Sequence, residues 1–313
     1  YNGSIKRDVN GGVMNLKKLL SLVAVATVSL TVVACEGQKP AESVETPALK
    51  EGAIDVVSRE AGSGTRQAFE EIIGFNGEGQ TPLTKSATIK DGNGVVATYV
   101  SENEQSLGYI SFVTLQENEG KIEGLTVDGV EATPENVLSG AYAVARPFEM
   151  VYMDQNLTEV ERAFIEFAAS QEGLEILDAN GTIVDKSAAE AFDMTKYNQL
   201  SGNLMMGGST STEAVVKALA DEFCALFPKV TYEYNATGSS AGVKNAIDGT
   251  YKLGFASREI KDSELESGIQ TTTLCMDGIA LVVNPENDVE DISTEQIKDV
   301  YTGTITEWSV LTK

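Results

Sequence analysis

The sequence predicts an α/β protein, because a strand, a glycine-rich turn and a helix start follow one another three times along the chain. These successions begin at residues 53, 204 and 230. In each, an apolar run of strand type passes through glycines and hydroxyl residues into a segment with apolar residues at helical spacing. The 313 residues, of which 42% are apolar and 22% charged, suffice for one large or two medium domains.

The N-terminal region is typical of an exported lipoprotein. Residues 1–13 are polar and precede a methionine, so we treat them as an extension. Residues 14–35 predict a signal peptide, with a basic start and an apolar stretch at 19–30 that is too short for a stable membrane span. This segment ends in Thr-Val-Val-Ala-Cys, which resembles the bacterial lipobox, so Cys35 is the expected lipidation site and 36–50 a polar tether. We expect a protein anchored by lipid at the outer face of the cytoplasmic membrane; an ordinary cleaved signal peptide is the alternative.

The first turn, which reads Ser-Arg-Glu-Ala-Gly-Ser-Gly-Thr-Arg from residue 58, has the composition of an anion site. Gly62 and Gly64 let the backbone turn sharply and approach a ligand closely. Ser63 and Thr65 add hydroxyl groups where the first N–H groups of the next helix have no acceptor. Arg59 adds a planar fork suited to two oxyanion oxygens. A capped helix beside a surface arginine explains the same residues, and both interpretations remain open.

Between the first and second turns, the pattern predicts further strands and a helix. Residues 107–113 alternate like a strand, and 125–130 form a strand that runs into a turn. Residues 141–152 are a long extended run, typical of a connection that crosses between lobes. Thr158 and Glu161 form a capping box, which predicts a helix start.

The second and third turns repeat the pattern of the first. Thr210 and Ser211 stand in the second turn, before a helix at 215–226, and Ser239 stands in the third, before a short helix at 243–247. None of the three turns ends in the Gly-Lys-Ser/Thr of a nucleotide-binding loop. A capped helix explains each turn singly, but three such turns in one chain favour a cradle for an oxyanion.

Charge and composition exclude several functions. The formal net charge of −24 argues against nucleic acid and anionic membrane surfaces as partners. The sequence contains no histidine, which excludes Ser-His-Asp and Cys-His catalysis and histidine-ligated metal. The three cysteines lack the paired spacing of a zinc site, and for Cys224 and Cys275 a disulfide and separate thiols both remain open.

Several motifs together resemble one family. They are Gly-Ser-Thr-Ser at 208–211, Gly-Ser-Ser-Ala-Gly at 238–242, Gly-Phe-Ala-Ser-Arg-Glu at 254–259, Asp-Gly-Ile-Ala-Leu-Val-Val-Asn-Pro at 277–285, Tyr-Thr-Gly-Thr-Ile-Thr-Glu-Trp at 301–308 and the turn at 58–66. The family is the phosphate-binding lipoprotein of the bacterial phosphate ABC importer, and the likeness covers nearly all of 51–313. It implies a two-lobed periplasmic-binding-protein fold of type II, in which each lobe is an α/β sheet and the anion is buried in the cleft between them.

The order of these motifs departs from that of the family, in which the Gly-Ser-Thr-Ser motif comes first. The resemblance therefore implies a circularly permuted chain, with the old ends joined within 178–202. One lobe would comprise 51–145 and 281–313, and the other 146–280. Permutation is tolerated where chain ends lie close together at the surface. A rearranged or misassembled gene product would have the same order, and the sequence leaves both explanations open.

The resemblance also implies which residues bind phosphate. They are donors at helix starts, one arginine and one serine at a specificity position: Arg59, Ser63, Gly64, Thr65, Thr210, Ser211, Ser239 and Ser257. So many small donors offset the cost of burying a charged anion. Some family members have Asp where Ser257 aligns, to accept the proton of phosphate and repel sulfate, so proton-based rejection of sulfate requires Glu60 or another carboxylate here. Arg258 either contacts the ligand or pairs with a neighbouring acid.

The expected function is capture of inorganic phosphate outside the membrane and its delivery to the membrane permease of a phosphate ABC importer. Lobe closure would retain the ligand, with no cofactor, no metal and no bond made or broken. A receptor for sulfate or molybdate is the first alternative. The second is a phosphate-ester hydrolase with Ser63 or Thr65 as nucleophile, although it would lack a histidine base. The third is a permuted chain that folds but no longer binds.

Overall fold

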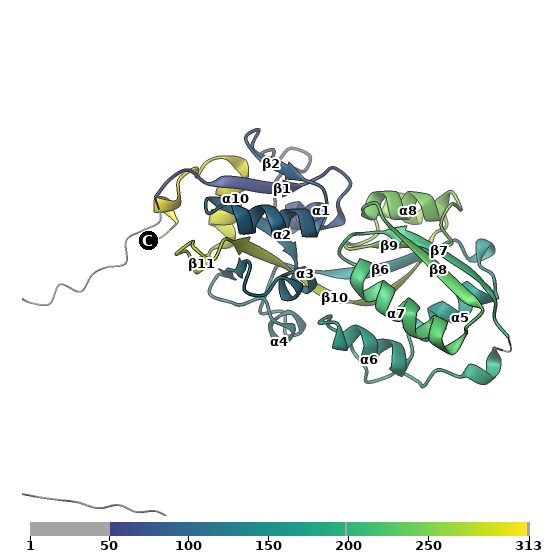
Figure 1. Cartoon of the computed structure of the whole chain (residues 1–313). Coiled ribbons are helices and arrows are strands. Elements are labelled where there is room, and N and C mark those ends of the chain that lie inside the picture. The colour runs from purple at the N-terminus through teal and green to yellow at the C-terminus, as the bar shows by residue number, and fades with distance from the viewer. Residues whose placement is uncertain (1–50, 198, 312–313) are drawn as a thin grey trace, which may run out of the picture. The chain divides into compact units, whose positions relative to one another are not determined.

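A computed structural model describes residues 51–197 and 199–311 (Figure 1). The expected extension, signal peptide, lipidated Cys35 and tether, which together span 1–50, lie outside the described residues. The described residues belong to one compact unit that begins at Pro47. Within the described ranges, none of the helices combines the length and apolar character needed to cross a bilayer.

Strands and helices alternate along most of the described chain, which confirms the predicted α/β class. The strands are β1 (Asp55–Arg59), β2 (Thr88–Lys90), β3 (Ser106–Ser111), β4 (Glu123–Gly124), β5 (Thr126–Val127), β6 (Ala145–Tyr152), β7 (Gly202–Gly208), β8 (Val230–Ala236), β9 (Leu253–Ala256), β10 (Gln270–Val283) and β11 (Asp291–Ile292). The helices are α1 (Gly64–Ile73), α2 (Asn93–Glu102), α3 (Phe112–Glu117), α4 (Pro134–Leu138), α5 (Glu159–Ala168), α6 (Gln171–Ala179), α7 (Glu213–Leu226), α8 (Ser239–Ile247), α9 (Asp262–Leu265) and α10 (Thr294–Thr302). Single 3-10 turns lie at Asp154–Asn156, Met194–Lys196 and Trp308–Val310.

One sheet continues through two lobes in the order β2-β1-β3-β10-β6-β9-β7-β8, with β4 beside β10 and a separate pair β11-β5. Strand β1 is parallel to β2 and β3, and β7 is parallel to β8 and β9. Strand β10 is antiparallel to both of its neighbours, and it divides between them: residues 270–278 pair with β6 and residues 279–283 pair with β3. The 14 residues of β10 therefore belong to both lobes.

The first lobe contains β1, β2, β3 and the end of β10, and an aromatic cluster fills its core. Phe69 of α1 stacks on Tyr109 of β3 with 4.1 Å between ring centroids, and Tyr301 of α10 packs edge-on against Phe69 at 4.9 Å. Burial raises the pKa of Tyr109 to about 12, so its phenol stays neutral. The Tyr109 hydroxyl lies 2.8 Å from the Oγ of Ser58 and accepts the N–H of Arg59 at 3.2 Å. The aromatic core therefore fixes the end of β1 that carries Arg59.

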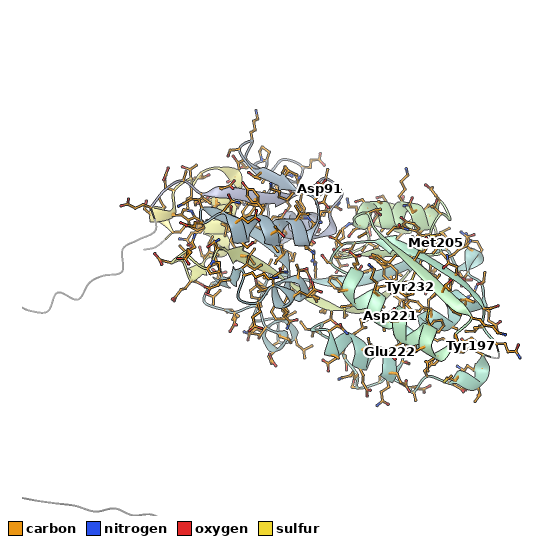
Figure 2. The ribbon with its side chains drawn as sticks, in the orientation of Figure 1. Asp91, Tyr197, Met205, Asp221, Glu222 and Tyr232 are labelled. Atoms are coloured by element: carbon orange, nitrogen blue, oxygen red, sulfur yellow. The ribbon has the colours of Figure 1, made fainter. Side chains whose placement is uncertain are left out.

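The second lobe contains β6, β9, β7, β8 and the start of β10, with α7 and α8 on opposite faces of the sheet (Figure 1). Val216 and Phe223 of α7 pack into the larger core cluster, whereas Val243 of α8 packs into a smaller one. Tyr232 of β8 donates to Asp221 of α7 at 2.7 Å, and both are labelled in Figure 2. This packing fixes the start of each helix relative to the ends of β7 and β9.

Two chain segments cross between the lobes as neighbouring strands. Ala145 of β6 faces Gly278 of β10, and the next pair in the same register is Arg146 and Asp277. Residues 279–283 of β10 pack into the core of the first lobe. Arg146 and Asp277 therefore stand at the boundary of the two lobes, on a ribbon formed by both crossings.

The structure confirms the predicted capping box and corrects one strand. The N–H of Thr158 donates to the Oε2 of Glu161 at 2.8 Å, one residue before α5 begins. The strand predicted at 107–113 is two residues too long, because β3 ends at Ser111 and α3 follows at once. The side chains at 112 and 113 are apolar because the start of α3 buries them.

The helix of the third turn also begins earlier than predicted. It starts at Ser239, not at residue 243, because Gly238 has a φ of +89° and reverses the chain before the hydroxyl residues. Serine at these positions resembles turn composition, but here it forms the first turn of α8. The range 178–202, in which the resemblance would join the old chain ends, overlaps the end of α6, which continues to Ala179.

Candidate anion-binding site

The residues predicted to bind phosphate lie at the ends of β1, β7 and β9 and at the starts of the helices that follow. The first lobe contributes Arg59, Ser63, Gly64 and Thr65, and the second contributes Thr210, Ser211, Ser239 and Ser257. Because β1 and β7 are parallel to their neighbours within each lobe, each of the loops after them lies at the carboxyl edge of the parallel strands of its own lobe. This edge is where ligands bind in open α/β sheets.

Arg59 is buried, with 1% of its surface exposed, so the alternative of a surface arginine is wrong. Its Nε and Nη2 atoms donate to the two carboxylate oxygens of Glu60 at 2.8 and 2.7 Å. Its Nη1 donates to the Oδ1 of Asn93 at 2.6 Å, and its Nη2 also donates to the Oγ1 of Thr210 at 3.1 Å. Glu60 therefore holds one edge of the guanidinium, and the other edge faces groups from both lobes.

Glu60 is ionised in this arrangement. Burial by itself would raise the pKa of this carboxyl, but the hydrogen bonds and positive charge of Arg59 and the N–H of Gly92 lower it below its ordinary value. The Gly92 N–H donates to the Oε2 of Glu60 at 3.1 Å. Glu60 thus balances the charge of Arg59 and ties β1 to the turn before α2.

Ser211 is the point where donors from both lobes converge. Its Oγ accepts from the Nδ2 of Asn93 at 2.8 Å and from the Nη2 of Arg146 at 3.0 Å. The Oγ1 of Thr65 lies 2.9 Å away and completes the cluster. The N–H of Ser211 is held by the Oγ of Ser209 at 3.0 Å.

Gly64 packs directly against the second lobe. A Cβ atom at this position would lie 2.0 Å from the Oγ of Ser239 and 2.8 Å from the Oγ of Ser257. Ser239 accepts the N–H of Ser257 at 3.0 Å, and the Oγ of Ser209 donates to the Oγ of Ser257 at 2.8 Å. The start of α1 and the start of α8 therefore meet at a position that requires glycine.

Ser63 is the N-cap of α1. Its Oγ accepts the N–H of Arg66 at 3.2 Å, so its hydroxyl hydrogen remains for another partner. The N–H groups of Gly64 and Thr65 occupy the first two positions of α1, where no intrahelical acceptor exists. The positive end of the α1 dipole is therefore directed toward the cluster around Ser211.

Arg258 pairs with the carboxylate of Glu264, which is one of the two roles expected for it. Its Nη1 and Nη2 atoms donate to the carboxylate of Glu264 at 2.9 and 2.8 Å, and Nη1 also donates to the backbone oxygen of Glu259 at 2.7 Å. Burial would raise the pKa of Glu264, but Arg258 and the N–H of Lys261 lower it below its ordinary value. Both Nη groups of Arg258 are thus engaged within the second lobe.

Two residues whose side chains donate to the Oγ of Ser211 were not among the predicted ligands. Asn93 is the first residue of α2, after the sequence Asp91-Gly92, and Figure 2 labels Asp91 at this turn. A strand, glycines and a helix start thus occur here a fourth time, but without the hydroxyl residues that mark the other three turns. Arg146 was predicted only as part of the crossing run, and no local pattern marks it as a site residue.

A groove of about 800 Å³ adjoins the cluster. Asn93 and Thr210, which both contact Arg59, line it together with residues of α2, α3 and α7. Glu117 of α3 and Glu213 of α7 face it from the two lobes. Partial burial, and then the charge of Glu213, raise the pKa of Glu117. The groove connects the buried cluster to solvent.

Cys224 and Cys275 are free thiols, of which Cys275 is buried. Among the described residues, no group of three or more acidic or cysteine side chains is arranged to hold a metal ion. The donors of the site are hydroxyl, amide and guanidinium groups, which suit an oxyanion.

Comparison with known proteins gives the same family as the sequence motifs. A family model described as a PBP superfamily domain matches residues 38–172 and 195–312. The phosphate-binding protein PstS 2 of Streptococcus agalactiae serotype V is 34% identical over 308 residues, which are 96% of this chain and 100% of that protein. The PstS 2 protein of Streptococcus pneumoniae serotype 4 is 35% identical over 301 residues, which are 94% and 99% of the two chains.

A solved structure supports the fold. The crystal structure of a phosphate ABC transporter, phosphate-binding protein from Streptococcus pneumoniae TIGR4, matches with a TM-score of 0.66 at 34% identity and covers 83% of this chain and 100% of that chain. The expected two-lobed periplasmic-binding-protein fold is confirmed by this match and by the family model. The chain therefore belongs to the PBP superfamily and, within it, to the family of the streptococcal PstS proteins.

Proposed function

We propose that this protein binds inorganic phosphate outside the cytoplasmic membrane and delivers it to the permease of a phosphate ABC importer. The observation that carries the proposal is that donors from both lobes converge on the Oγ of Ser211. The Nδ2 of Asn93 lies 2.8 Å from this atom and the Nη2 of Arg146 lies 3.0 Å from it. Such buried donors need a strong acceptor, and a phosphate oxygen is a better acceptor than a hydroxyl. The names of the streptococcal relatives support phosphate as the anion.

In the proposed mechanism, each lobe binds one side of the anion. The helix-start N–H groups and hydroxyls of Ser63, Gly64 and Thr65 donate from the first lobe, with Arg59 balancing charge. Thr210, Ser211, Ser239 and Ser257 belong to the second lobe. A ligand that contacts both lobes stabilises only the state in which both reach it, so it favours closure. The paired crossing of β6 and β10 is the proposed hinge.

The chain organisation fits this mechanism. We propose that 51–145 with 281–313 forms one lobe and that 146–280 forms the other, in a circularly permuted order of the family's segments.

We propose attachment to the outer face of the membrane through a lipid on Cys35. Cys35→Ala would test this: the variant is expected in the soluble fraction, whereas the unchanged chain stays with the membrane. Retention of the variant in the membrane would overturn the anchor. Equal release of both chains would favour an ordinary cleaved signal peptide.

We propose no catalytic role. Ser63 already accepts a hydrogen bond from the N–H of Arg66, and a hydrolase would need a base to activate its hydroxyl. The relatives are phosphate-binding transport proteins by name. Turnover of a chromogenic phosphate ester that is lost in Ser63→Ala would revive the hydrolase alternative.

Titration calorimetry of the full chain with phosphate and with sulfate, in phosphate-free buffer, tests the proposal. One-to-one phosphate binding with little sulfate heat is expected. Sulfate or molybdate binding in preference to phosphate would assign another oxyanion. A folded protein that binds none of these anions would mean that the site is inactive.

A further inference from the structure

The cluster contains a second buried arginine that the expected phosphate ligands do not include. Arg146 has 2% of its surface exposed and lies at the boundary of the two lobes, opposite Asp277 in the strand register. Its Nε and Nη2 atoms donate to the Oδ2 of Asp277 at 3.2 and 3.0 Å. The Oδ1 of Asp277 accepts from the Oγ of Ser111 at 2.9 Å. Asp277 is thus fixed from both sides, and it orients the guanidinium of Arg146.

The guanidinium of Arg146 can donate hydrogen bonds from two edges, and only one of them is fully paired. Asp277 occupies the edge formed by Nε and Nη2, so the edge formed by Nη2 and Nη1 points away from Asp277. Nη2 on this edge donates to the Oγ of Ser211 at 3.0 Å. Nη1 on the same edge is buried and has no hydrogen-bond partner. A buried charged donor without a partner destabilises the folded protein. Nη1 of Arg146 therefore needs a hydrogen-bond acceptor beside Ser211.

A second observation also points to an anion at this place. Burial lowers the pKa of Arg146 and the charge of Arg59 lowers it further, against the opposing effect of Asp277. The two guanidinium groups are linked through Asn93, which accepts from Arg59 and donates to Ser211. Two buried positive charges on either side of one hydroxyl repel each other, and an anion between them removes that repulsion.

We propose that Arg146 is a direct ligand of the bound oxyanion, through Nη1, and that it provides the second positive charge that a doubly charged phosphate requires. This inference rests on the proposed phosphate-binding function and adds a binding residue to it. Glu60 balances Arg59 and Asp277 balances Arg146, so each carboxylate orients one guanidinium and leaves its outer edge for the ligand. Asp277 is a positioning residue and not a ligand.

Arg258 offers a matched control. It is likewise buried, with 4% exposed, likewise paired with a carboxylate, and likewise has an unpartnered atom, Nε. Its Nη groups, however, donate to Glu264 and to a backbone oxygen within the same lobe. If any buried arginine of this lobe supported phosphate binding equally, substitutions of Arg146 and Arg258 would reduce phosphate affinity to the same degree.

The test is phosphate titration of the full chain and its Arg146→Gln, Arg146→Lys and Arg258→Gln variants. A charge-assisted hydrogen bond contributes about 1.5–3 kcal/mol, so Arg146→Gln should weaken phosphate binding about 10- to 150-fold. Arg146→Lys should lose less, because it keeps the charge without the fork. Arg258→Gln should bind within about threefold of the unchanged chain. Equal affinity of Arg146→Gln and the unchanged chain would overturn the inference.

Folding must be separated from binding, because Arg146→Gln leaves Asp277 buried without a cation. The double variant Arg146→Gln/Asp277→Asn removes both charges, and it should unfold at a temperature close to that of the unchanged chain while losing phosphate affinity to the same degree. Restored affinity in the double variant would make the role of Arg146 purely structural and overturn the inference. If the unchanged chain itself binds no phosphate, the proposed function fails first, and the inference fails with it.

Discussion

A Cβ atom on Gly64 would lie 2.0 Å from the Oγ of Ser239 and 2.7 Å from its Cβ, at the contact between α1 of one lobe and α8 of the other. The same helix starts are joined by the N–H of Ser240, which donates to the backbone oxygen of Gly62 at 3.2 Å. Gln67 adds a hydrogen bond of 2.9 Å to the Oγ of Ser240. The closeness of the lobes at this point therefore depends on the absence of a side chain at residue 64.

Gly64→Ala should impair lobe closure without harming either lobe. Alanine suits the first position of a helix, but its Cβ would meet Ser239 Cβ, which cannot rotate away. Overpacking of this kind costs about 1–3 kcal/mol, so phosphate affinity should fall by about 5- to 150-fold. Calorimetric titration measures this, and Gly94→Ala, where a Cβ would meet nothing within 4 Å, is the control. Equal affinities of the two variants would contradict the closure model.

Arg59→Ala should weaken phosphate binding by about 2–5 kcal/mol, because it removes a buried charged donor and leaves Glu60 without its cation. Arg162→Ala serves as the control, since Arg162 forms an exposed pair with Asp154. Titration of both variants with phosphate checks the prediction. Affinity near that of the unchanged chain in Arg59→Ala would remove this arginine from the site.

Ser257→Asp should increase the preference for phosphate over sulfate. Ser257 is fully buried at the contact with Gly64. A carboxylate there would accept a hydrogen bond from the proton of phosphate, and it would repel sulfate, which has no proton to donate. Ser257→Asn has nearly the same shape without the charge and is the matched control. Competition titrations give the ratio of the two affinities. An unchanged ratio in Ser257→Asp would place residue 257 away from the ligand.

Glu117→Gln should stabilise the protein at neutral pH. Partial burial and the charge of Glu213 raise the pKa of Glu117, so its ionised form opposes folding. This penalty is absent in acid, where the carboxyl is protonated in both states, and it grows as the pH rises from the ordinary pKa of the unfolded chain to the raised pKa of the folded protein. The gain in Glu117→Gln should stay below about 1 kcal/mol, because the carboxyl is only partly buried and solvent screens its charge.

Thermal unfolding at about pH 7 and about pH 4 measures this gain, which should be present at the first pH and absent at the second. Glu119→Gln, two residues along and also exposed, is the control. A gain of the same size at both pH values would show that it does not arise from ionisation of Glu117.

Local patterns predict those parts of the site that are contiguous in the sequence. The turns that carry Arg59, Ser211 and Ser239 each follow a strand and open a helix, and the glycines and hydroxyls that mark them are the groups that form the site. The start of α1 is signalled in the same way, because Ser63 caps it with its own side chain. These short-range rules act within a few residues, so the sequence suffices to find them.

The remainder of the site depends on contacts between distant residues. Asn93 was missed because its helix is capped by Gly92, which has no side chain to give a signal, and because Gly94 lowers helix propensity. Arg146 was missed because its role depends on Asp277, which lies 131 residues away. The guanidinium of Arg59 donates both to Glu60 and to Thr210 of the other lobe, and this arrangement likewise depends on the assembled fold.

Strand β10 pairs with strands of both lobes, and this has a consequence for how the protein can be divided. Residues 270–278 complete the sheet of one lobe and residues 279–283 that of the other, so neither lobe expressed alone can contain a whole β10 without an unpaired strand edge. A fragment that ends at the boundary would expose backbone groups that pair in the intact chain. Calorimetric unfolding of the whole protein should therefore give one cooperative transition, and separately produced lobes should aggregate rather than reassemble into a binding protein.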